Sequence, residues 1–163
     1  MPSLLFVCTA NICRSPMAEY LMKEKLAKLE SMPENPAEGW RVESAGTWGM
    51  DGSDMAEGVR TVLEEMGIKS GSHPARTVTA EMLNEFDLIL TMERGQKEAL
   101  NIEFPESAGR IFMLSEMVGE RFDLRDPMGE PIDEFRQTAR IIDTILNRGF
   151  DRIKQFIGDR ERR

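Results

Sequence analysis

Cysteine and histidine are scarce in this sequence, and their scarcity excludes several classes of protein. The 163 residues include two cysteines, Cys8 and Cys13, and one histidine, His73. Two cysteines so close together cannot cross-link a small secreted scaffold, so we expect a reducing compartment and predict a cytoplasmic protein. Two thiols and one distant imidazole are too few ligands for a closed zinc site. We therefore expect no bound metal.

Long apolar runs and an excess of basic charge are also lacking. No apolar run approaches the roughly 20 residues that a membrane helix needs, and no basic region precedes a signal-like stretch at the N-terminus. We expect no membrane association. The formal net charge of −8 argues against a nucleic-acid partner, because such partners are bound through basic faces. The composition is that of a globular chain, and the length predicts a single domain over residues 1–163.

Apolar runs of strand length alternate with helical patterns along the chain. Strands are predicted at residues 4–7, 40–45, 86–91 and 110–114. Helices are predicted at residues 15–29, 54–66, 79–85 and 93–101, and from residue 131 onward with an interruption at Gly149. Residues 31–39 and 116–130 are predicted as connections. The expected fold class is α/β, a Rossmann-like three-layer α/β/α sandwich with a central parallel sheet of about four strands.

The most informative segment is the loop between the first strand and the first helix. Five residues separate Cys8, at the strand end, from Arg14. A strand, loop and helix in succession gather backbone N–H groups and a helix N-terminus around one anion. A thiolate there is a nucleophile, and an arginine fork binds two phosphate oxygens. Ser15 is predicted to cap the helix and Pro16 suits its first turn. The loop therefore predicts a phosphate held for attack by sulfur.

A longer string around this loop resembles a known family. The string is Phe6-Val7-Cys8-Thr9-x-Asn11-Ile12-Cys13-Arg14-Ser15-Pro16-Met17-Ala18-Glu19, and it closely resembles that of the low-molecular-weight protein tyrosine phosphatases. The likeness continues through residues 40–47, 72–76, 86–92 and 126–127, and it covers nearly the whole chain. The resemblance implies hydrolysis of phosphotyrosine in proteins through a cysteinyl-phosphate intermediate. It further implies a phosphorylated protein as substrate and no cofactor, and we expect a monomer or weak dimer.

The resemblance also implies catalytic roles for three residues. Cys8 is the nucleophile and Arg14 binds the phosphate. Asp126 protonates the leaving group and then takes a proton from the water that hydrolyses the intermediate. Asp123 and Asp133 lie nearby in the sequence and are alternatives for the acid.

Further residues are assigned by the resemblance to binding and support. Those that bind the phosphate or line the substrate pocket are Thr9, Ala10, Asn11, Ile12, Cys13, Ser15, Trp48 and Met128. Ser15 is expected to donate a hydrogen bond to the sulfur, while Ser44 and His73 support the loop through Asn11.

Three of these positions leave alternatives open. Family members with a second cysteine like Cys13 can close a reversible disulfide to the oxidised nucleophile, and the other interpretation is a small buried side chain. Trp48 either stacks on a substrate ring or covers the core. Ala10 stands where the family usually has glycine, and a positive φ there would cost alanine about 1 kcal/mol.

The substrate is also predicted with alternatives. Ile12 favours phosphotyrosine, because the phosphoarginine branch of the family has threonine at this position. Met128 and Gly129 stand where tyrosine-directed relatives have an aromatic pair, and they resemble the arginine branch instead. We predict tyrosine, with a protein arginine phosphatase as the alternative. An arsenate reductase would need an external thiol, because no further cysteine pair is present. The remaining alternative is a phosphate-binding module without catalysis, which would not need an acid such as Asp126.

Overall fold

The computed structural model describes residues 1–33 and 39–163, and within them four parallel strands form one sheet. The strands are β1 (Ser3–Cys8), β2 (Arg41–Gly46), β3 (Leu88–Thr91) and β4 (Ile111–Met113). Their order across the sheet is β2-β1-β3-β4. The carboxyl end of β1 therefore lies between the ends of β2 and β3, which is where ligands bind in sheets of this kind.

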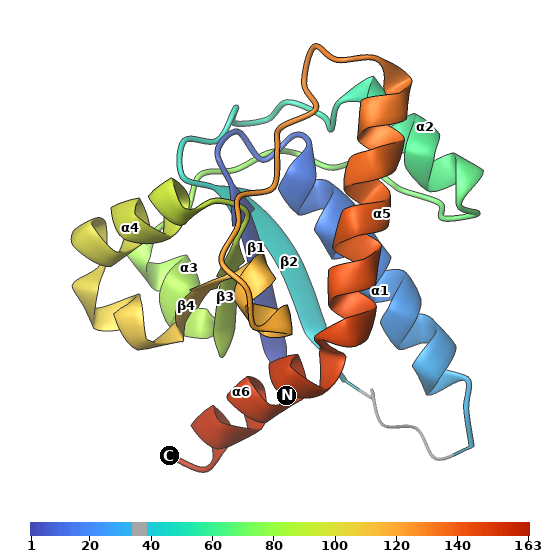
Figure 1. The fold of residues 1–163 in the computed structure, drawn as a ribbon. Helices are drawn as coiled ribbons and strands as arrows, with labels where there is room; N and C mark the ends of the chain where they lie inside the picture. The colour runs from blue at the N-terminus through green and yellow to red at the C-terminus, as the bar shows by residue number, and fades with distance from the viewer. Residues whose placement is uncertain (34–38) are drawn as a thin grey trace.

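Helices cover both faces of the sheet (Figure 1). The α-helices are α1 (Arg14–Glu30), α2 (Glu57–Glu65), α3 (Ala80–Glu85), α4 (Arg94–Glu103), α5 (Ile132–Arg148) and α6 (Phe150–Glu161). Two 3₁₀ helices, η1 (Pro105–Arg110) and η2 (Leu114–Val118), flank β4. Successive side chains of β1 point to opposite faces, because strand side chains alternate. Leu4 and Phe6 pack with residues of α1, α2 and α5, whereas Leu5 and Val7 pack with residues of α3 and α4. The predicted three-layer sandwich is confirmed.

Single residues set several of the helix ends. The hydroxyl oxygen of Thr79 accepts the amide of Met82 at 3.1 Å and caps α3. Gly67 has φ 77° just after α2, a conformation that glycine adopts without strain. Gly149 separates α5 from α6, and a Cβ atom there would lie 2.9 Å from the backbone oxygen of Met117. The predicted interruption at Gly149 is confirmed, and close packing against Met117 leaves room only for glycine there.

The structure corrects several of the predicted boundaries, and β3 begins at Leu88 rather than at residue 86. α2 begins at Glu57 rather than at residue 54, because the amide of Ala56 donates to the oxygen of Ile12 at 2.7 Å. The loop predicted at residues 116–130 begins inside η2, and β4 is shorter than predicted. Of the connection predicted at residues 31–39, residues 34–38 lie outside the described part of the chain.

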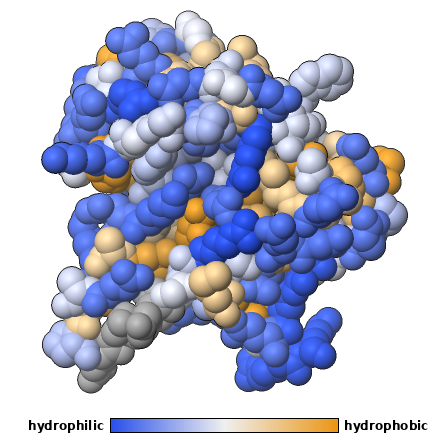
Figure 2. All heavy atoms as spheres, turned by 180° about the vertical axis from the view of Figure 1, so that it is seen from behind, coloured by the Kyte–Doolittle hydropathy of each residue, from blue (hydrophilic) through white to orange (hydrophobic). Residues whose placement is uncertain are grey.

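The surface is mostly hydrophilic where Figure 2 shows it, with hydrophobic residues gathered in a band across the middle of that face. Among the described residues, no helix combines the length and the apolar character that crossing a membrane requires. Both chain termini lie at the end of the molecule opposite the loop that follows β1 (Figure 1).

Candidate active site

The backbone of the loop from Cys8 to Cys13 is turned so that its carbonyl groups face outward. The oxygens of Cys8, Thr9, Ala10 and Ile12 accept the amides of residues 47, 48, 50 and 56, at 2.7 to 3.0 Å. His73 Nε2 donates to the oxygen of Asn11 at 2.9 Å. Among the described residues, no hydrogen bond uses an amide of residues 9–13 as donor. The amides are therefore left for an anion at the N-terminus of α1.

Asn11 makes this conformation possible. It is the one residue other than glycine with positive φ in the described chain, at 61°. Asparagine tolerates this left-handed conformation better than most residues. Ala10 does not have a positive φ, so the strain considered for alanine does not arise.

The Asn11 side chain also orders the residues beneath the loop. Its Nδ2 atom donates to the hydroxyl oxygens of Ser15, at 2.8 Å, and Ser44, at 3.0 Å. The amide of Arg76 donates to Oδ1 of Asn11 at 3.1 Å, which fixes the orientation of the side-chain amide. Ser15 Oγ accepts from Asn11 and lies 3.0 Å from Sγ of Cys8. The one serine hydroxyl proton is shared between the sulfur and the backbone oxygen of Ala45, which lies farther away at 3.4 Å. Donated to the sulfur, it would stabilise a thiolate.

Ser15 does not cap α1, contrary to the prediction. The helix begins at Arg14, its N-cap residue is Cys13, and no side chain caps it. The Ser15 hydroxyl is instead buried between the sulfur of Cys8 and Asn11.

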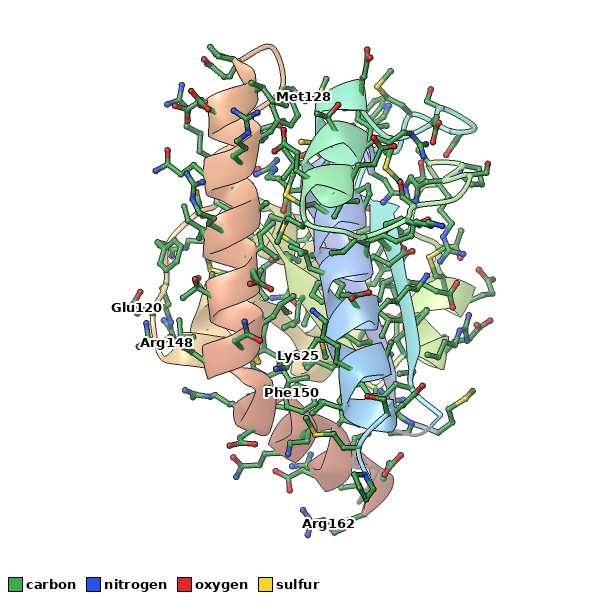
Figure 3. The ribbon with its side chains drawn as sticks, turned by 90° about the vertical axis from the view of Figure 1, so that its right-hand side faces the viewer. Lys25, Glu120, Met128, Arg148, Phe150 and Arg162 are labelled. Atoms are coloured by element: carbon green, nitrogen blue, oxygen red, sulfur yellow. The ribbon has the colours of Figure 1, made fainter. Side chains whose placement is uncertain are left out.

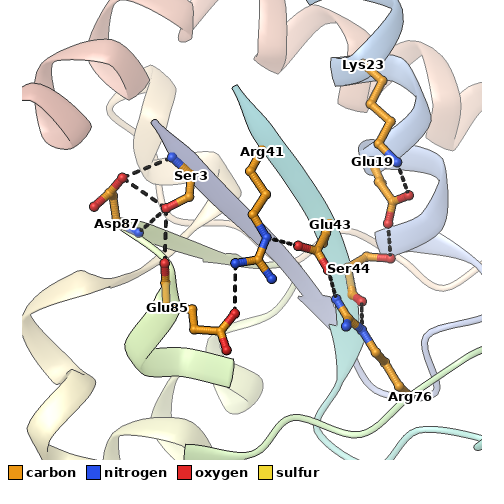
Figure 4. A network of polar contacts seen from close by, with 9 residues as sticks. All are labelled: Ser3, Glu19, Lys23, Arg41, Glu43, Ser44, Arg76, Glu85 and Asp87. Atoms are coloured by element: carbon orange, nitrogen blue, oxygen red, sulfur yellow. Dashed lines mark hydrogen bonds and ion pairs between the residues drawn. The ribbon is translucent and has the colours of Figure 1, made fainter. Parts of the chain in front are cut away.

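Ser44 is tied to two further elements (Figure 4). Its hydroxyl donates to Glu19 of α1 at 2.8 Å, and Lys23 donates to the other carboxylate oxygen of Glu19 at 2.8 Å. The guanidinium of Arg76 donates to the oxygen of Ser44 at 3.1 Å and pairs with Glu43 at 2.7 Å. The carboxyl end of β2 is thereby anchored to α1 and to the segment around residue 76.

Arg14 is buried although it carries a charge, and its close contacts among the described residues are made by Nη1. Its side chain is 3% exposed. Nη1 donates to the backbone oxygen of Leu124 at 2.6 Å and lies 2.9 Å from a carboxylate oxygen of Glu93. Nε is buried and has no hydrogen-bond partner among the described residues. The edge formed by Nε and Nη2 therefore remains for a bidentate anion.

Asp126 lies beside this arginine. Its Oδ2 atom is 3.8 Å from Nη2 of Arg14, and its side chain is 48% exposed. Its Oδ1 atom accepts the amide of Met128 at 3.0 Å. The two alternatives for the acid are engaged elsewhere, because Asp123 accepts the amide of Arg94 and Asp133 pairs with Arg136.

Trp48 and Met50 border the site because their amides donate to loop carbonyl groups, and Met128 borders it because its amide donates to Asp126. We call this rim the mouth of the site. Trp48 is 82% exposed and Met50 and Met128 are exposed as well, so Trp48 does not cover the core. Figure 3 shows Met128 near one end of α5 and Arg148 near the other, so the mouth lies far from the junction of α5 with α6. The hydroxyl of Thr9, at the polar side, accepts from Gln96 at 3.1 Å.

Cys13 ends the loop as the N-cap residue of α1. The thiols of Cys8 and Cys13 are both free and buried. Burial raises the pKa of the Cys13 thiol, and the negative charges of Asp126 and Cys8 raise it further against the opposing effect of Arg14. Cys13 is therefore protonated when Cys8 is a thiolate.

Sequence reasoning missed Glu93, Gln96 and Leu124, which position the loop from outside it. Glu93 and Gln96 follow β3, whose carboxyl end lies next to that of β1. A polar residue just after a neighbouring parallel strand is a signal that could have indicated Glu93 and Gln96. Leu124 acts through its backbone oxygen, for which the sequence carries no signal.

The chain is similar over most of its length to known phosphatases. Residues 3–156 match the family described as low molecular weight phosphotyrosine protein phosphatase. A protein-arginine-phosphatase of Geobacillus stearothermophilus is 34% identical, over 89% of this chain and 91% of that protein. A low molecular weight protein-tyrosine-phosphatase of Acinetobacter johnsonii is also 34% identical, over 88% and 92%. The crystal structure of a low molecular weight protein tyrosine phosphatase from T. tengcongensis superposes with a TM-score of 0.85 at 33% identity, over 93% of this chain and 99% of that one.

Proposed function

The chain belongs to the low molecular weight phosphotyrosine protein phosphatase family of cysteine-dependent phosphatases, and we propose that it hydrolyses phosphotyrosine in proteins with Cys8 as the nucleophile. The observation that carries this proposal is the convergence of three groups on one space. The sulfur of Cys8 lies 3.0 Å from the Ser15 hydroxyl at a loop with outward carbonyls. Arg14 offers its Nε and Nη2 edge there, and Asp126 lies 3.8 Å from Nη2.

In the first step the Cys8 thiolate attacks phosphorus. A sulfur–phosphorus bond forms while the bond from phosphorus to the tyrosine oxygen breaks. The loop amides and Arg14 stabilise the negative charge on the transferring phosphoryl group. Asp126 gives its proton to the departing phenol oxygen.

In the second step water attacks the cysteinyl phosphate. The ionised carboxylate of Asp126 takes a proton from the water, and the sulfur–phosphorus bond breaks. The electron pair returns to Cys8, whose thiolate accepts a hydrogen bond from Ser15. Inorganic phosphate is released, and both residues are restored.

Two observations support tyrosine as the leaving group. The exposed side chains of Trp48 and Met128 supply an apolar surface at the mouth, which suits a phenyl ring. Ile12 adds no hydroxyl beside the nucleophile. Protein arginine phosphatase is the second candidate, because Glu93 and Asp126 place two carboxylates near Arg14 that would attract a guanidinium. Arsenate reduction ranks last, because it would require an external thiol.

We also infer that residues 1–163 form one phosphatase domain acting on a phosphoprotein as a monomer or weak dimer. A cytoplasmic location is supported by the need for a reduced thiol at Cys8. The position of Met128 beside the acid supports its assignment to the substrate pocket.

The test compares hydrolysis of one peptide carrying phosphotyrosine with hydrolysis of one carrying phosphoarginine, without added metal. We expect the phosphotyrosine peptide to be preferred and Cys8→Ser to abolish both reactions. Ile12→Thr should shift the preference toward phosphoarginine. A native preference for phosphoarginine would replace tyrosine by the second candidate, and activity in Cys8→Ser would overturn the proposed nucleophile.

A further inference from the structure

We propose that the carboxylate of Glu93, paired with Nη1 of Arg14, competes electrostatically with a phosphate bound at the Nε and Nη2 edge, and so weakens the binding of both substrate and product. This inference rests on the proposed function, because it takes the loop from Cys8 to Arg14 as the phosphate site. The carboxylate oxygen of Glu93 lies 2.9 Å from Nη1 of Arg14, whereas that of Asp126 lies 3.8 Å from Nη2. Glu93 is therefore the main counterion of the arginine in the free protein.

A buried guanidinium needs such a counterion. The Arg14 side chain is 3% exposed, and a buried charge without a partner strongly destabilises a fold. Glu93 supplies the missing charge in the free enzyme, and its own side chain is 36% exposed, so it loses only part of its hydration. A bound phosphate would supply the same negative charge to the same cation.

The Glu93 side chain is held where it is. Its carboxylate accepts from the side-chain Nε2 of Gln96 at 2.9 Å. Gln96 is itself buried, and its Oε1 atom accepts the amides of Met92 and Glu93 at 3.0 and 2.9 Å. Because these contacts fix the carboxylate, it stays beside Arg14 when phosphate arrives. Two negative groups then share one cation, which disfavours the complex.

Repulsion by Glu93 weakens the binding of every ligand that carries a phosphate dianion. Substrate and product are both bound less tightly, so the effect appears in KM and in inhibition by phosphate more than in kcat. The benefit to the enzyme is that product phosphate dissociates and leaves a charge-balanced site. Glu93 is in this sense a positioning residue whose charge sets phosphate affinity.

A different role for Glu93 would give the opposite sign. If it served only to orient Arg14, its loss would weaken phosphate binding. Glu93→Gln separates the two roles, because the amide keeps the length and one acceptor oxygen and removes only the charge. Glu98→Gln is the matched control, since Glu98 lies on the same helix and pairs with the exposed Arg94 at 2.9 Å.

The experiment titrates inorganic phosphate into the native protein and both variants, by calorimetry and by inhibition of aryl phosphate hydrolysis. We expect Glu93→Gln to bind phosphate about tenfold more tightly, as removal of one nearby charge in a partly buried site implies, and Glu98→Gln to bind like the native protein. Saturating phosphate should also raise the Tm of Glu93→Gln more than that of the native protein, because a ligand that binds only the folded state stabilises it according to its affinity.

The outcomes separate this inference from the function on which it rests. If the native protein binds phosphate and Glu93→Gln binds it equally or more weakly, the proposed competition is wrong and the phosphate site stands. Native protein that binds no phosphate at millimolar concentration would overturn both. A thermal unfolding curve of each variant without phosphate confirms that it is folded.

Discussion

The Nη1 atom of Arg14 donates to the backbone oxygen of Leu124 at 2.6 Å. Leu124 lies two positions before Asp126, and its own amide donates to the oxygen of Met92 at 2.9 Å. The arginine that is proposed to bind phosphate therefore also holds the segment that carries the proposed acid. The two parts of the site, which lie 112 positions apart in the sequence, are joined by one side chain.

Arg14→Lys should impair both functions of this residue. A lysine cannot offer the bidentate edge, and it cannot donate to Leu124 in the same geometry. We expect kcat/KM for an aryl phosphate to fall by about 100-fold or more. We also expect limited proteolysis within residues 119–131 to become faster. Arg125→Lys is the control, because Arg125 is exposed and pairs with Glu130 in the same loop. Unchanged proteolysis in Arg14→Lys would show that the Leu124 contact does not hold the segment.

Asp126→Asn should be most damaging with poor leaving groups. The amide preserves the acceptor for the Met128 amide but cannot give a proton to the departing oxygen. We expect kcat/KM, which reports only the first step, to fall about 100-fold for phenyl phosphate and less for an activated nitrophenyl ester, whose leaving group needs less protonation. Asp133→Asn, at an exposed residue paired with Arg136, should leave both rates unchanged. If kcat/KM falls by the same factor for the two esters, Asp126 is not the acid.

Gly46→Ala should displace the phosphate loop. A Cβ atom at Gly46 would lie 2.3 Å from the backbone oxygen of Thr9, closer than any tolerated contact. We expect a destabilisation of about 1–3 kcal/mol in denaturant unfolding, together with a loss of activity. At Gly71 a Cβ atom would meet nothing within 4 Å, so Gly71→Ala should change stability by less than about 0.5 kcal/mol. Equal effects of the two substitutions would contradict the close approach of β2 to the loop.

Cys13 should protect the nucleophile against peroxide. Hydrogen peroxide converts the Cys8 thiolate to a sulfenic acid and releases hydroxide. The Cys13 thiol then attacks that sulfur, losing its proton, and the oxygen leaves as water to give a disulfide. We expect the native enzyme to regain most of its activity after treatment with dithiothreitol, and Cys13→Ser to regain much less of its own initial activity. Peptide mass mapping should find the disulfide in the native enzyme alone, and equal recovery of both proteins would assign Cys13 to packing.

Periodicity predicted the layers of this fold, and it could not predict the contacts that complete the site. β1 and β3 are uninterrupted apolar runs, and α5 has a clear helical stripe, so local pattern and tertiary burial agree there. The loop was recognisable because Cys8 and Arg14 are close in sequence. Ser15 was assigned to a helix cap because its position suits one, but the sulfur and Asn11 bind its hydroxyl instead. Partners such as Leu124 are set by the route of a distant loop, which no local pattern encodes.

The proposed reaction depends on a covalent bond between phosphorus and the sulfur of Cys8. The direct measurement is intact-protein and peptide mass spectrometry after rapid acid quenching of Asp126→Asn mixed with an activated aryl phosphate, since loss of the general base slows hydrolysis of the intermediate. We predict a mass increase of one phosphoryl group, located on the peptide that contains Cys8 and absent when Cys8→Ser is introduced as well. Turnover with no phosphorylated Cys8 at any quench time, or a phosphoryl group on another residue, would contradict the account.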